Sequence, residues 1–276
     1  MRFGLDISQH QLTWEELMAR ARLAEDAGLD GAWVFDHFKA LYGDPRGPTL
    51  EAWTLLAGLA RETSTVRLGT MVTGMTHRHP SVLAAEVVTV DHLSGGRVEC
   101  AVGAAWNEEE HRELGIPFPP GPERLDRLEE GVQVLRRLFT EDDVTFEGHH
   151  VRVAHATYRP RPVQQPHPPI WIGGTGRRRL LPIAGRYADV WHGWADDGAE
   201  LAAMNSIIDR AAEEAGREPS EILRASSLSI SEPWDEVRAE YEWMAAERIG
   251  YLMIEWPSEG RGRLEEFLER VLPTLA

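Results

Sequence analysis

Apolar and polar positions alternate along the chain in two different rhythms. Short apolar runs stand at Arg2–Ile7 and Gly31–Phe35, and an amphipathic segment lies between them. Thr13 and Glu16 form a capping box that marks the start of a helix in this segment, and Gly28 follows its last turn. Short apolar strands that alternate with helices are typical of a parallel sheet whose strands are joined by helical crossovers.

The same alternation continues to the end of the chain and predicts eight strands, each followed by a helix. The further strands are expected at Val66–Val72, Val98–Val102, Ile170–Gly174, Asp189–His192, Arg224–Ile230 and Tyr251–Glu255. The further helices are expected at about Thr49–Arg61, Pro80–Leu93, Glu123–Phe139, Arg179–Tyr187, Glu200–Ala215, Asp235–Arg248 and Arg263–Leu272. Eight such pairs can close into a (β/α)8 barrel, which typically takes about 250 residues.

One excursion interrupts this order after the fourth strand and its helix. The segment VTFEGHHVRV at 144–153 alternates twice around a turn, which predicts a β-hairpin outside the barrel. Residues 1–276 are then a single α/β domain, a (β/α)8 TIM barrel with one hairpin excursion. An open dinucleotide-binding sheet is disfavoured, because the first strand leads into GLDISQ and not into a GxGxxG segment.

Charge and composition narrow the range of partners. The chain has 45 acidic and 29 basic residues, so its formal charge of -16 disfavours nucleic acid and anionic membranes as partners. No apolar run approaches the roughly 18 residues that suggest a membrane span, and the first residues lack a signal-peptide pattern. The one cysteine, Cys100, stands in an apolar strand. We expect a cytoplasmic protein that acts on a small molecule, with Cys100 buried and unreactive.

An acid and a histidine follow the second strand directly. In a barrel of this kind the active site is built from the loops at the carboxyl ends of the strands, which is where Asp36 and His37 stand. An imidazole can transfer a proton near neutral pH, and a neighbouring carboxylate can orient it. The alternative is that Asp36 caps the loop and His37 is only packed. The position at a strand end favours a catalytic role.

A glycine-rich turn, GGTGR at 173–177, joins the fifth strand to its helix. Glycines let a ligand approach the backbone, and the amides at a helix start attract anions, so this turn is a candidate phosphate site to which Arg177 adds charge. Glycine-rich turns also occur for purely steric reasons.

Acidic and histidine residues are also frequent near the strand ends. Glu108–Glu110 suit the first turn of a helix, where carboxylates interact favourably with the positive end of the helix dipole. One of them can face the pocket. His77, His79 and His111 could in principle bind a metal together with Asp36. A metal site is disfavoured because the HExxH spacing is missing.

Several blocks of the first 195 residues resemble the luciferase-like monooxygenase family, in particular its F420 (deazaflavin)-dependent branch. These blocks are WVFDHF at 33–38, RLGTMVTG at 67–74, RHPSVLAAEVVTVDHLSGGRVE at 78–99, VGAAWNEEEHRELGIPFP at 102–119, ERLDRLEEGVQVLRRLF at 123–139 and PIWIGGTG at 169–176. The resemblance implies a (β/α)8 barrel, a homodimer, a flavin or deazaflavin above the strand ends, and hydride transfer.

The resemblance also implies roles for individual residues. His37 matches the histidine that assists proton transfer, and Asp36 matches the acid that approaches the deazaflavin or positions the histidine. From the acidic neighbours of Asn107, Glu109 is taken as a third catalytic residue. Met71, Val72 and Thr73 match a segment that supports the ring and often contains a cis peptide bond. The remaining expected cofactor contacts are Asn107, Gly173, Gly174, Thr175, Gly176 and Arg177.

Two positions depart from the sugar-phosphate dehydrogenases of that family. Trp106 stands where they have a catalytic glutamate, and Leu41 where they have a tryptophan, so sugar-phosphate oxidation is disfavoured. We expect an apolar substrate pocket made by Phe38, Trp106 and Trp194. The preferred function is hydride transfer between coenzyme F420 and a small organic substrate. The alternatives are an FMN-dependent monooxygenase and a non-catalytic cofactor-binding barrel.

Overall fold

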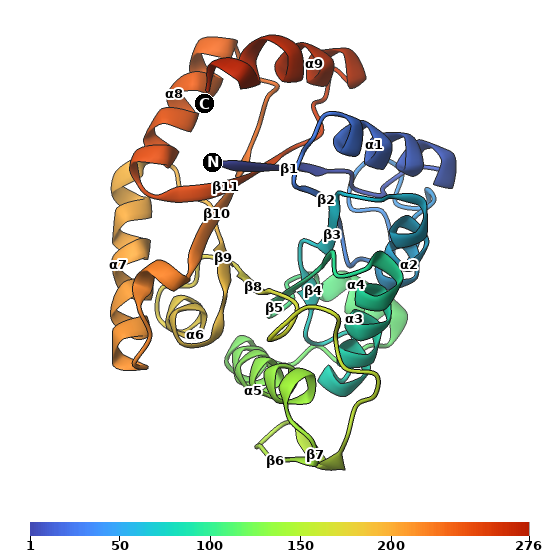
Figure 1. Cartoon of the computed structure of the whole chain (residues 1–276), viewed down its shortest axis with the longest axis vertical. Coiled ribbons are helices and arrows are strands. Elements are labelled where there is room, and N and C mark those ends of the chain that lie inside the picture. The colour runs from blue at the N-terminus through green and yellow to red at the C-terminus, as the bar shows by residue number, and fades with distance from the viewer. Residues whose placement is uncertain (276) are drawn as a thin grey trace.

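Parallel strands form a closed barrel in the computed structural model, which describes residues 1–275 (Figure 1). The strands are β1 (Arg2–Asp6), β2 (Gly31–Val34), β3 (Arg67–Thr70), β4 (Thr73–Gly74), β5 (Val98–Gly103), β8 (Ile170–Gly173), β9 (Val190–His192), β10 (Leu223–Leu228) and β11 (Ile249–Ile254). Their order is β3-β2-β1-β11-β10-β9-β8-β5-β4, and β3 also pairs with β5, which closes the ring. Because β3 and β4 are successive parts of the third barrel strand, the ring has the eight expected strand positions.

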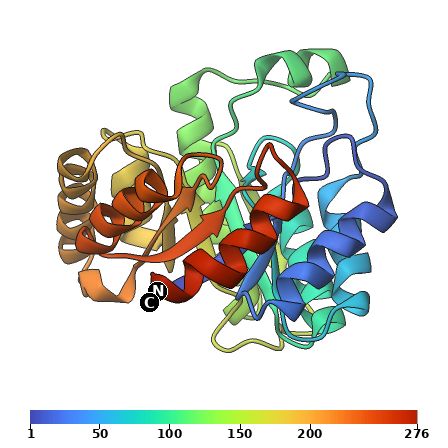
Figure 2. The same cartoon turned by 90° about the horizontal axis from the view of Figure 1, so that it is seen from above.

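Helices form the outer layer around this ring (Figure 1). They are α1 (Trp14–Asp26), α2 (Ala52–Glu62), α3 (Pro80–Ser94), α5 (Gly121–Thr140), α6 (Leu180–Tyr187), α7 (Gly198–Glu214), α8 (Trp234–Ala246) and α9 (Arg261–Glu266). The short helix α4 (Glu108–Leu114) lies beyond the strand ends instead (Figure 2). The last helix continues through a π-helical turn, Phe267–Val271, and a 3-10 turn, Leu272–Thr274. No helix within residues 1–275 has the length and apolarity that crossing a membrane requires.

The expected hairpin is confirmed. Strands β6 (Val144–Glu147) and β7 (Arg152–Ala156) pair antiparallel after α5 and lie outside the ring (Figure 1). The first helix also starts as predicted, since the Thr13 side chain accepts from the Glu16 amide and the Glu16 side chain accepts from the Thr13 amide. The predicted third strand, Val66–Val72, is divided because a cis peptide bond joins Met71 to Val72 between β3 and β4.

Large aromatic side chains fill the interior of the barrel. Trp33, Trp171 and Tyr251 are almost fully buried, and the Trp33 indole N–H donates to the Tyr251 hydroxyl at 2.8 Å. These rings need space on the neighbouring strands, and Gly31 supplies it: a Cβ there would lie 2.6 Å from the Tyr251 hydroxyl. Met71 and Val72 pack against this aromatic layer, so the layer supports the segment that follows β3.

Candidate active site

A cavity of about 920 Å³ lies at the carboxyl ends of the barrel strands. Its volume is in the range of small-molecule sites. The loop after β2 (blue) and α4 (green) stand beyond the strand ends at the top of Figure 2. The sequence-predicted residues that line the cavity are Asp36, His37, Met71, Val72, Trp106, Asn107, Gly173, Gly174 and Trp194.

His37 contacts a glutamate that is distant in the sequence. Its ring Nδ1 lies 2.7 Å from Oε2 of Glu110, whose side chain is fully buried. The other carboxylate oxygen accepts from the backbone amides of Phe38 at 2.7 Å and Lys39 at 3.3 Å. Burial alone would raise the pKa of the Glu110 carboxyl, but the hydrogen bond and charge of His37 and the Phe38 amide hold it below its usual range. Glu110 is therefore an ionised acceptor beneath the histidine.

The choice of Glu109 as a catalytic residue is corrected by this geometry. The Glu109 side chain is 68% exposed and forms an ion pair with Arg112 at 3.8 Å. The Asn107 side chain caps α4 by accepting from the Glu110 amide at 3.2 Å, which fixes where the helix starts. Successive helical residues point about 100° apart, so Glu110 faces inward and Glu109 faces solvent.

Asp36 is buried against an arginine that the sequence interpretation did not single out. The Arg78 guanidinium donates to the two carboxylate oxygens at 2.6 and 3.0 Å, and Nδ1 of His77 lies 3.3 Å away. Burial alone would raise the pKa of the Asp36 carboxyl, but the hydrogen bonds from His77 and Arg78 and the Arg78 charge hold it below its usual range. The expectation that Asp36 positions His37 is thus corrected: Asp36 pairs with Arg78, and Glu110 contacts the histidine.

Arg78 also lies beside two further carboxyl groups. Its guanidinium is 3.3 Å from Glu51 and 3.2 Å from Glu86. Burial raises the pKa of the Glu86 carboxyl to about 7; Arg78 opposes the rise, whereas Glu51 and Asp36 add to it. Near neutral pH the folded protein therefore keeps a proton on Glu86 that an unfolded chain has already released.

We expect Glu86→Gln to stabilise the protein at high pH relative to the wild type. The folded wild type binds the Glu86 proton up to about pH 7, against an ordinary value of 4.5. The stability that this proton gives is complete below pH 4.5 and is lost as the pH rises through about 7. Glutamine does not titrate, so its stability relative to the wild type should rise by about 1–2 kcal/mol between pH 5 and 8.

Chemical denaturation of both proteins at several pH values measures this difference. The control is Glu62→Gln, because Glu62 lies in an exposed ion pair with Arg22, and such pairs contribute little to stability. A Glu86→Gln difference that is flat, or that falls as the pH rises, would contradict the assignment.

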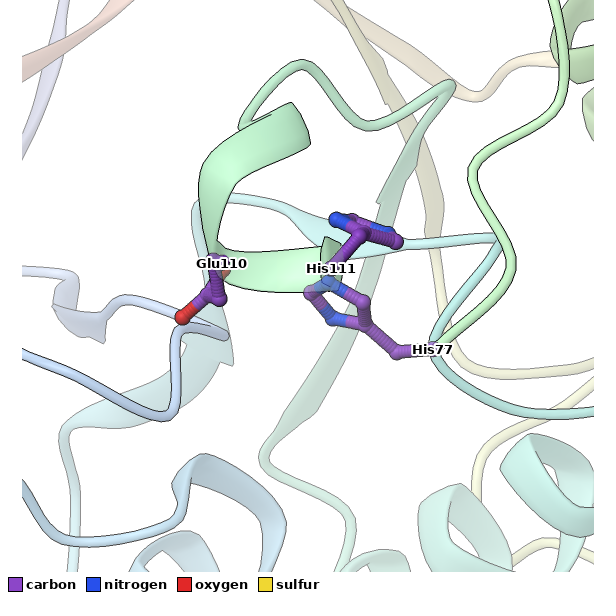
Figure 3. A group of neighbouring side chains, drawn as sticks. All are labelled: His77, Glu110 and His111. Carbon is purple, nitrogen blue, oxygen red and sulfur yellow. The ribbon is translucent and has the colours of Figure 1, made fainter. Parts of the chain in front are cut away.

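Two histidines and Glu110 form a compact group beside the cavity (Figure 3). One possible ligand atom from each of His77, Glu110 and His111 lies within 4.8 Å of the others. The two ring nitrogens of His111, however, already lie 2.7 Å from the Asn107 carbonyl and from the Thr76 hydroxyl. Both oxygens of Glu110 are also in use, so a metal ion would have to displace existing hydrogen bonds. Only His77 Nε2 is a buried atom without a partner in this group.

The segment after β3 is expected to contain a cis peptide bond and to face the cavity, and part of this prediction is confirmed. The expected cis peptide bond is present between Met71 and Val72, and both side chains line the cavity. Val72 fits between two strands because Gly103 and Gly173 flank it: a Cβ on either would lie 2.7 Å from the valine. Thr73 is corrected, since it is buried and its hydroxyl accepts from the indole N–H of Trp53 at 3.0 Å instead of facing the cavity.

The glycine-rich turn reaches the cavity only through its first two residues. Gly173 and Gly174 line the cavity, whereas Thr175, Gly176 and Arg177 lie outside its lining. The Arg177 guanidinium is exposed and pairs with Glu200 of α7 at 2.8 Å. The expected contact of Arg177 with a bound phosphate therefore stays a prediction, and Glu200 is its partner in this structure.

Aromatic rings surround the mouth of the cavity. Trp106, Trp194 and Tyr42 line it, although 67%, 61% and 68% of their surfaces are exposed. The Trp106 ring lies 5.6 Å from the His37 ring. Phe38, in contrast, packs on His77 at 5.1 Å and does not line the cavity, so its assignment to the substrate pocket is corrected.

Two carboxyl groups and one arginine line another part of the cavity wall. Burial raises the pKa of the Asp6 carboxyl, although hydrogen bonds from Ser8 oppose this effect. Burial, together with the Asp6 charge, also raises the pKa of Glu255. Arg20 is the one arginine or lysine among the lining residues, and strand-end reasoning misses it because it comes from α1. The wall therefore has little positive charge.

Comparison with known proteins agrees with this architecture. The model of the luciferase-like monooxygenase family matches residues 1–272. An F420-dependent glucose-6-phosphate dehydrogenase of Kineococcus radiotolerans is 32% identical over 247 residues, which cover 87% of this chain and 70% of the relative. An F420-dependent hydroxymycolic acid dehydrogenase of Mycobacterium tuberculosis is 30% identical over 226 residues, which cover 82% of this chain and 61% of the relative.

Solved structures share the fold over the whole chain. An F420-dependent secondary alcohol dehydrogenase in complex with an F420-acetone adduct superposes with a TM-score of 0.89 and 22% identity, covering 100% of this chain and 99% of the other. A monooxygenase from Streptomyces bottropensis superposes with a TM-score of 0.81 and 22% identity, covering 100% of both chains. On its family match and its sequence relatives, the chain belongs to the luciferase-like monooxygenase family of oxidoreductases.

Proposed function

We propose that this protein transfers a hydride between coenzyme F420 and a small, uncharged organic substrate, with His37 handling the proton. The observation that carries this proposal is that His37 lines the cavity while its Nδ1 is held by the buried carboxylate of Glu110. A histidine supported in this way can exchange a proton with a substrate hydroxyl or carbonyl oxygen near neutral pH. Curated relatives that are about 30% identical are named as F420-dependent dehydrogenases, which supports the choice of cofactor.

The cavity residues fit a flat ring system. Gly103, Gly173 and Gly174 line the cavity without side chains, and a Cβ on either of the first two would collide with Val72. Met71 and Val72 present an apolar surface on top of the buried aromatic layer. These residues would hold the deazaflavin ring, which supplies the hydride chemistry when bound.

His37 would act on the substrate side of this ring. In alcohol oxidation its Nε2 accepts the hydroxyl proton as the hydride leaves the same carbon, and in carbonyl reduction the protonated ring returns it. Its Nδ1 is not available for this step because it contacts Glu110. Trp106 is in edge contact with the His37 ring and would cover one side of it.

The charge and shape of the wall favour an uncharged substrate. Arg20 is the one arginine or lysine of the lining, and it lies near the Asp6 carboxyl, so the wall has little free positive charge to attract an anion. Trp106 and Trp194 offer apolar contact at the mouth. Secondary alcohols, ketones and activated alkenes have the matching chemistry, whereas a sugar phosphate does not.

An FMN-dependent monooxygenase is the second candidate, because the surface made by Met71, Val72 and the lining glycines would suit a flavin ring as well. The solved monooxygenase with the same fold is compatible with that alternative. A barrel that only binds a cofactor is the third candidate, and it would have no use for a histidine held by a buried glutamate.

Titrating the cofactor-free protein with oxidised F420 and with FMN tests the proposal. We expect tighter binding of F420 in both fluorescence and calorimetry, followed by oxidation of reduced F420 when ketones or activated alkenes are added. Tighter binding of FMN would overturn the F420 assignment and move the protein to the oxygen-using branch. Binding of neither cofactor would overturn the whole proposal.

A further inference from the structure

We propose that Glu110 is a positioning residue that fixes which nitrogen of His37 carries the hydrogen. Nδ1 of His37 then always donates to Glu110, and Nε2 is left with a lone pair that faces the cavity. The proposal rests on the proposed function only for its kinetic test, because the position of the hydrogen can be observed without any cofactor.

The contacts of Glu110 leave one arrangement. An ionised carboxylate accepts hydrogen bonds and donates none, so the nitrogen 2.7 Å from its Oε2 must carry the hydrogen. The other oxygen already accepts from two backbone amides, those of Phe38 and Lys39. Full burial of the Glu110 side chain keeps water from replacing any of these partners.

No neighbour of His37 competes for this role. Asp36 precedes it in the chain but is bound to Arg78 by two hydrogen bonds. The His77 ring centroid lies 6.4 Å from the His37 ring centroid, and Nδ1 of His77 faces Asp36. Two further rings, Phe35 at 6.3 Å and Trp106 at 5.6 Å, meet His37 edge-on, and neither ring offers a hydrogen-bond acceptor.

The position of Glu110 on α4 couples this contact to the cavity mouth. Asn107 caps α4 directly after Trp106, and Glu110 is the third residue of the helix. The same short helix therefore carries Glu110, which contacts His37, and begins directly after Trp106, whose ring also contacts His37. A substrate that contacts Trp106 would therefore lie next to the start of α4, the helix that positions Glu110.

Glu110→Gln should reverse the arrangement. The Phe38 and Lys39 amides are both donors, so the glutamine oxygen must take their side. The glutamine NH₂ group then points at His37 and donates to Nδ1, which moves the hydrogen to Nε2. The lone pair that would accept the substrate proton is lost, although the side chain has nearly the same size.

Nitrogen-15 NMR of the histidine rings in the cofactor-free protein tests this directly. The His37 signals are assigned by their loss in His37→Asn. Long-range proton–nitrogen correlations should show the hydrogen on Nδ1 in the wild type and on Nε2 in Glu110→Gln. The matched control is Glu109→Gln, one residue away on the solvent side of α4, which should keep the wild-type pattern.

Kinetics give a second readout. With F420 and a secondary alcohol, Glu110→Gln should lower kcat by about 10²–10³-fold, with KM changed less than about threefold and the Glu109→Gln rate unaltered. A hydrogen on Nε2 in the wild type, or an unchanged tautomer in Glu110→Gln, would overturn the proposal. If Glu110→Gln does not fold, the wild-type tautomer alone decides. A correct tautomer without F420 turnover would reject the proposed function and leave the role of Glu110 intact.

Discussion

Replacing His37 by alanine is expected to lower turnover by about 10²–10⁴-fold, the usual contribution of a general acid or base. The histidine lines the cavity and its side chain is 13% exposed, so alanine removes the proton acceptor and leaves a small polar gap. In the proposed function, Met71, Val72 and the glycines would hold the deazaflavin ring, so the dissociation constant for the cofactor should change little. Steady-state kinetics and a fluorescence titration of the same variant separate the two effects.

His155→Ala is a suitable control because His155 is an exposed residue of the hairpin, paired with Asp143. It should leave both turnover and cofactor affinity unchanged. Equal turnover of the wild type and His37→Ala would remove His37 from the reaction. Loss of cofactor binding in His37→Ala would instead show that the histidine holds the ring.

Replacing Arg78 by methionine should destabilise the protein by about 3–5 kcal/mol at neutral pH, the typical cost of leaving a buried charge unpaired. Asp36 is 1% exposed and Arg78 is 10% exposed, and two hydrogen bonds join them. Without the arginine, only His77 is left to oppose the effect of burial, so the pKa of Asp36 should rise. The cost should therefore be largest at neutral pH and shrink as the pH falls through the new, higher pKa.

The double variant Asp36→Asn/Arg78→Met is the matched control. It removes both charges, so it should recover much of the stability that Arg78→Met loses. Urea denaturation at pH 7 and pH 4 measures all the variants. A double variant that is as unstable as Arg78→Met at pH 7 would show that the cost does not come from the unpaired carboxylate.

The residues at the strand ends of this site could be predicted because they follow from counting the alternating strands and helices along the sequence. Once the third strand is placed near residues 66–72, the barrel rule puts His77 near the cavity, and the same rule places His37 after the second strand. Met71 is expected there only from the family resemblance. The partners of these residues are different in kind. Glu110 is 73 residues from His37, and Arg78 is 42 residues from Asp36. Periodicity cannot pair such positions, because only the closed barrel brings them together.

One signal for Glu110 was present in the sequence. An asparagine followed three residues later by a glutamate is a helix-start pattern, and Asn107 and Glu110 have this spacing. The start of the helix sets its rotation, which decides between Glu109 and Glu110. No sequence pattern indicates that Arg177 pairs with Glu200, because Glu200 lies 23 residues further along the chain, on α7. A bound phosphate would have to compete with Glu200 for the guanidinium.

The aromatic layer inside the barrel affects the order in which cofactor and substrate can bind. Trp33, Trp171 and Tyr251 block the space below Met71 and Val72. A ring that rests on this layer and a substrate that contacts Trp106 would then both enter from the carboxyl ends of the strands, where the cavity lies. The deeper compound has to arrive first and depart last, so the proposed reaction would run in a compulsory order: cofactor in, substrate in, product out, cofactor out.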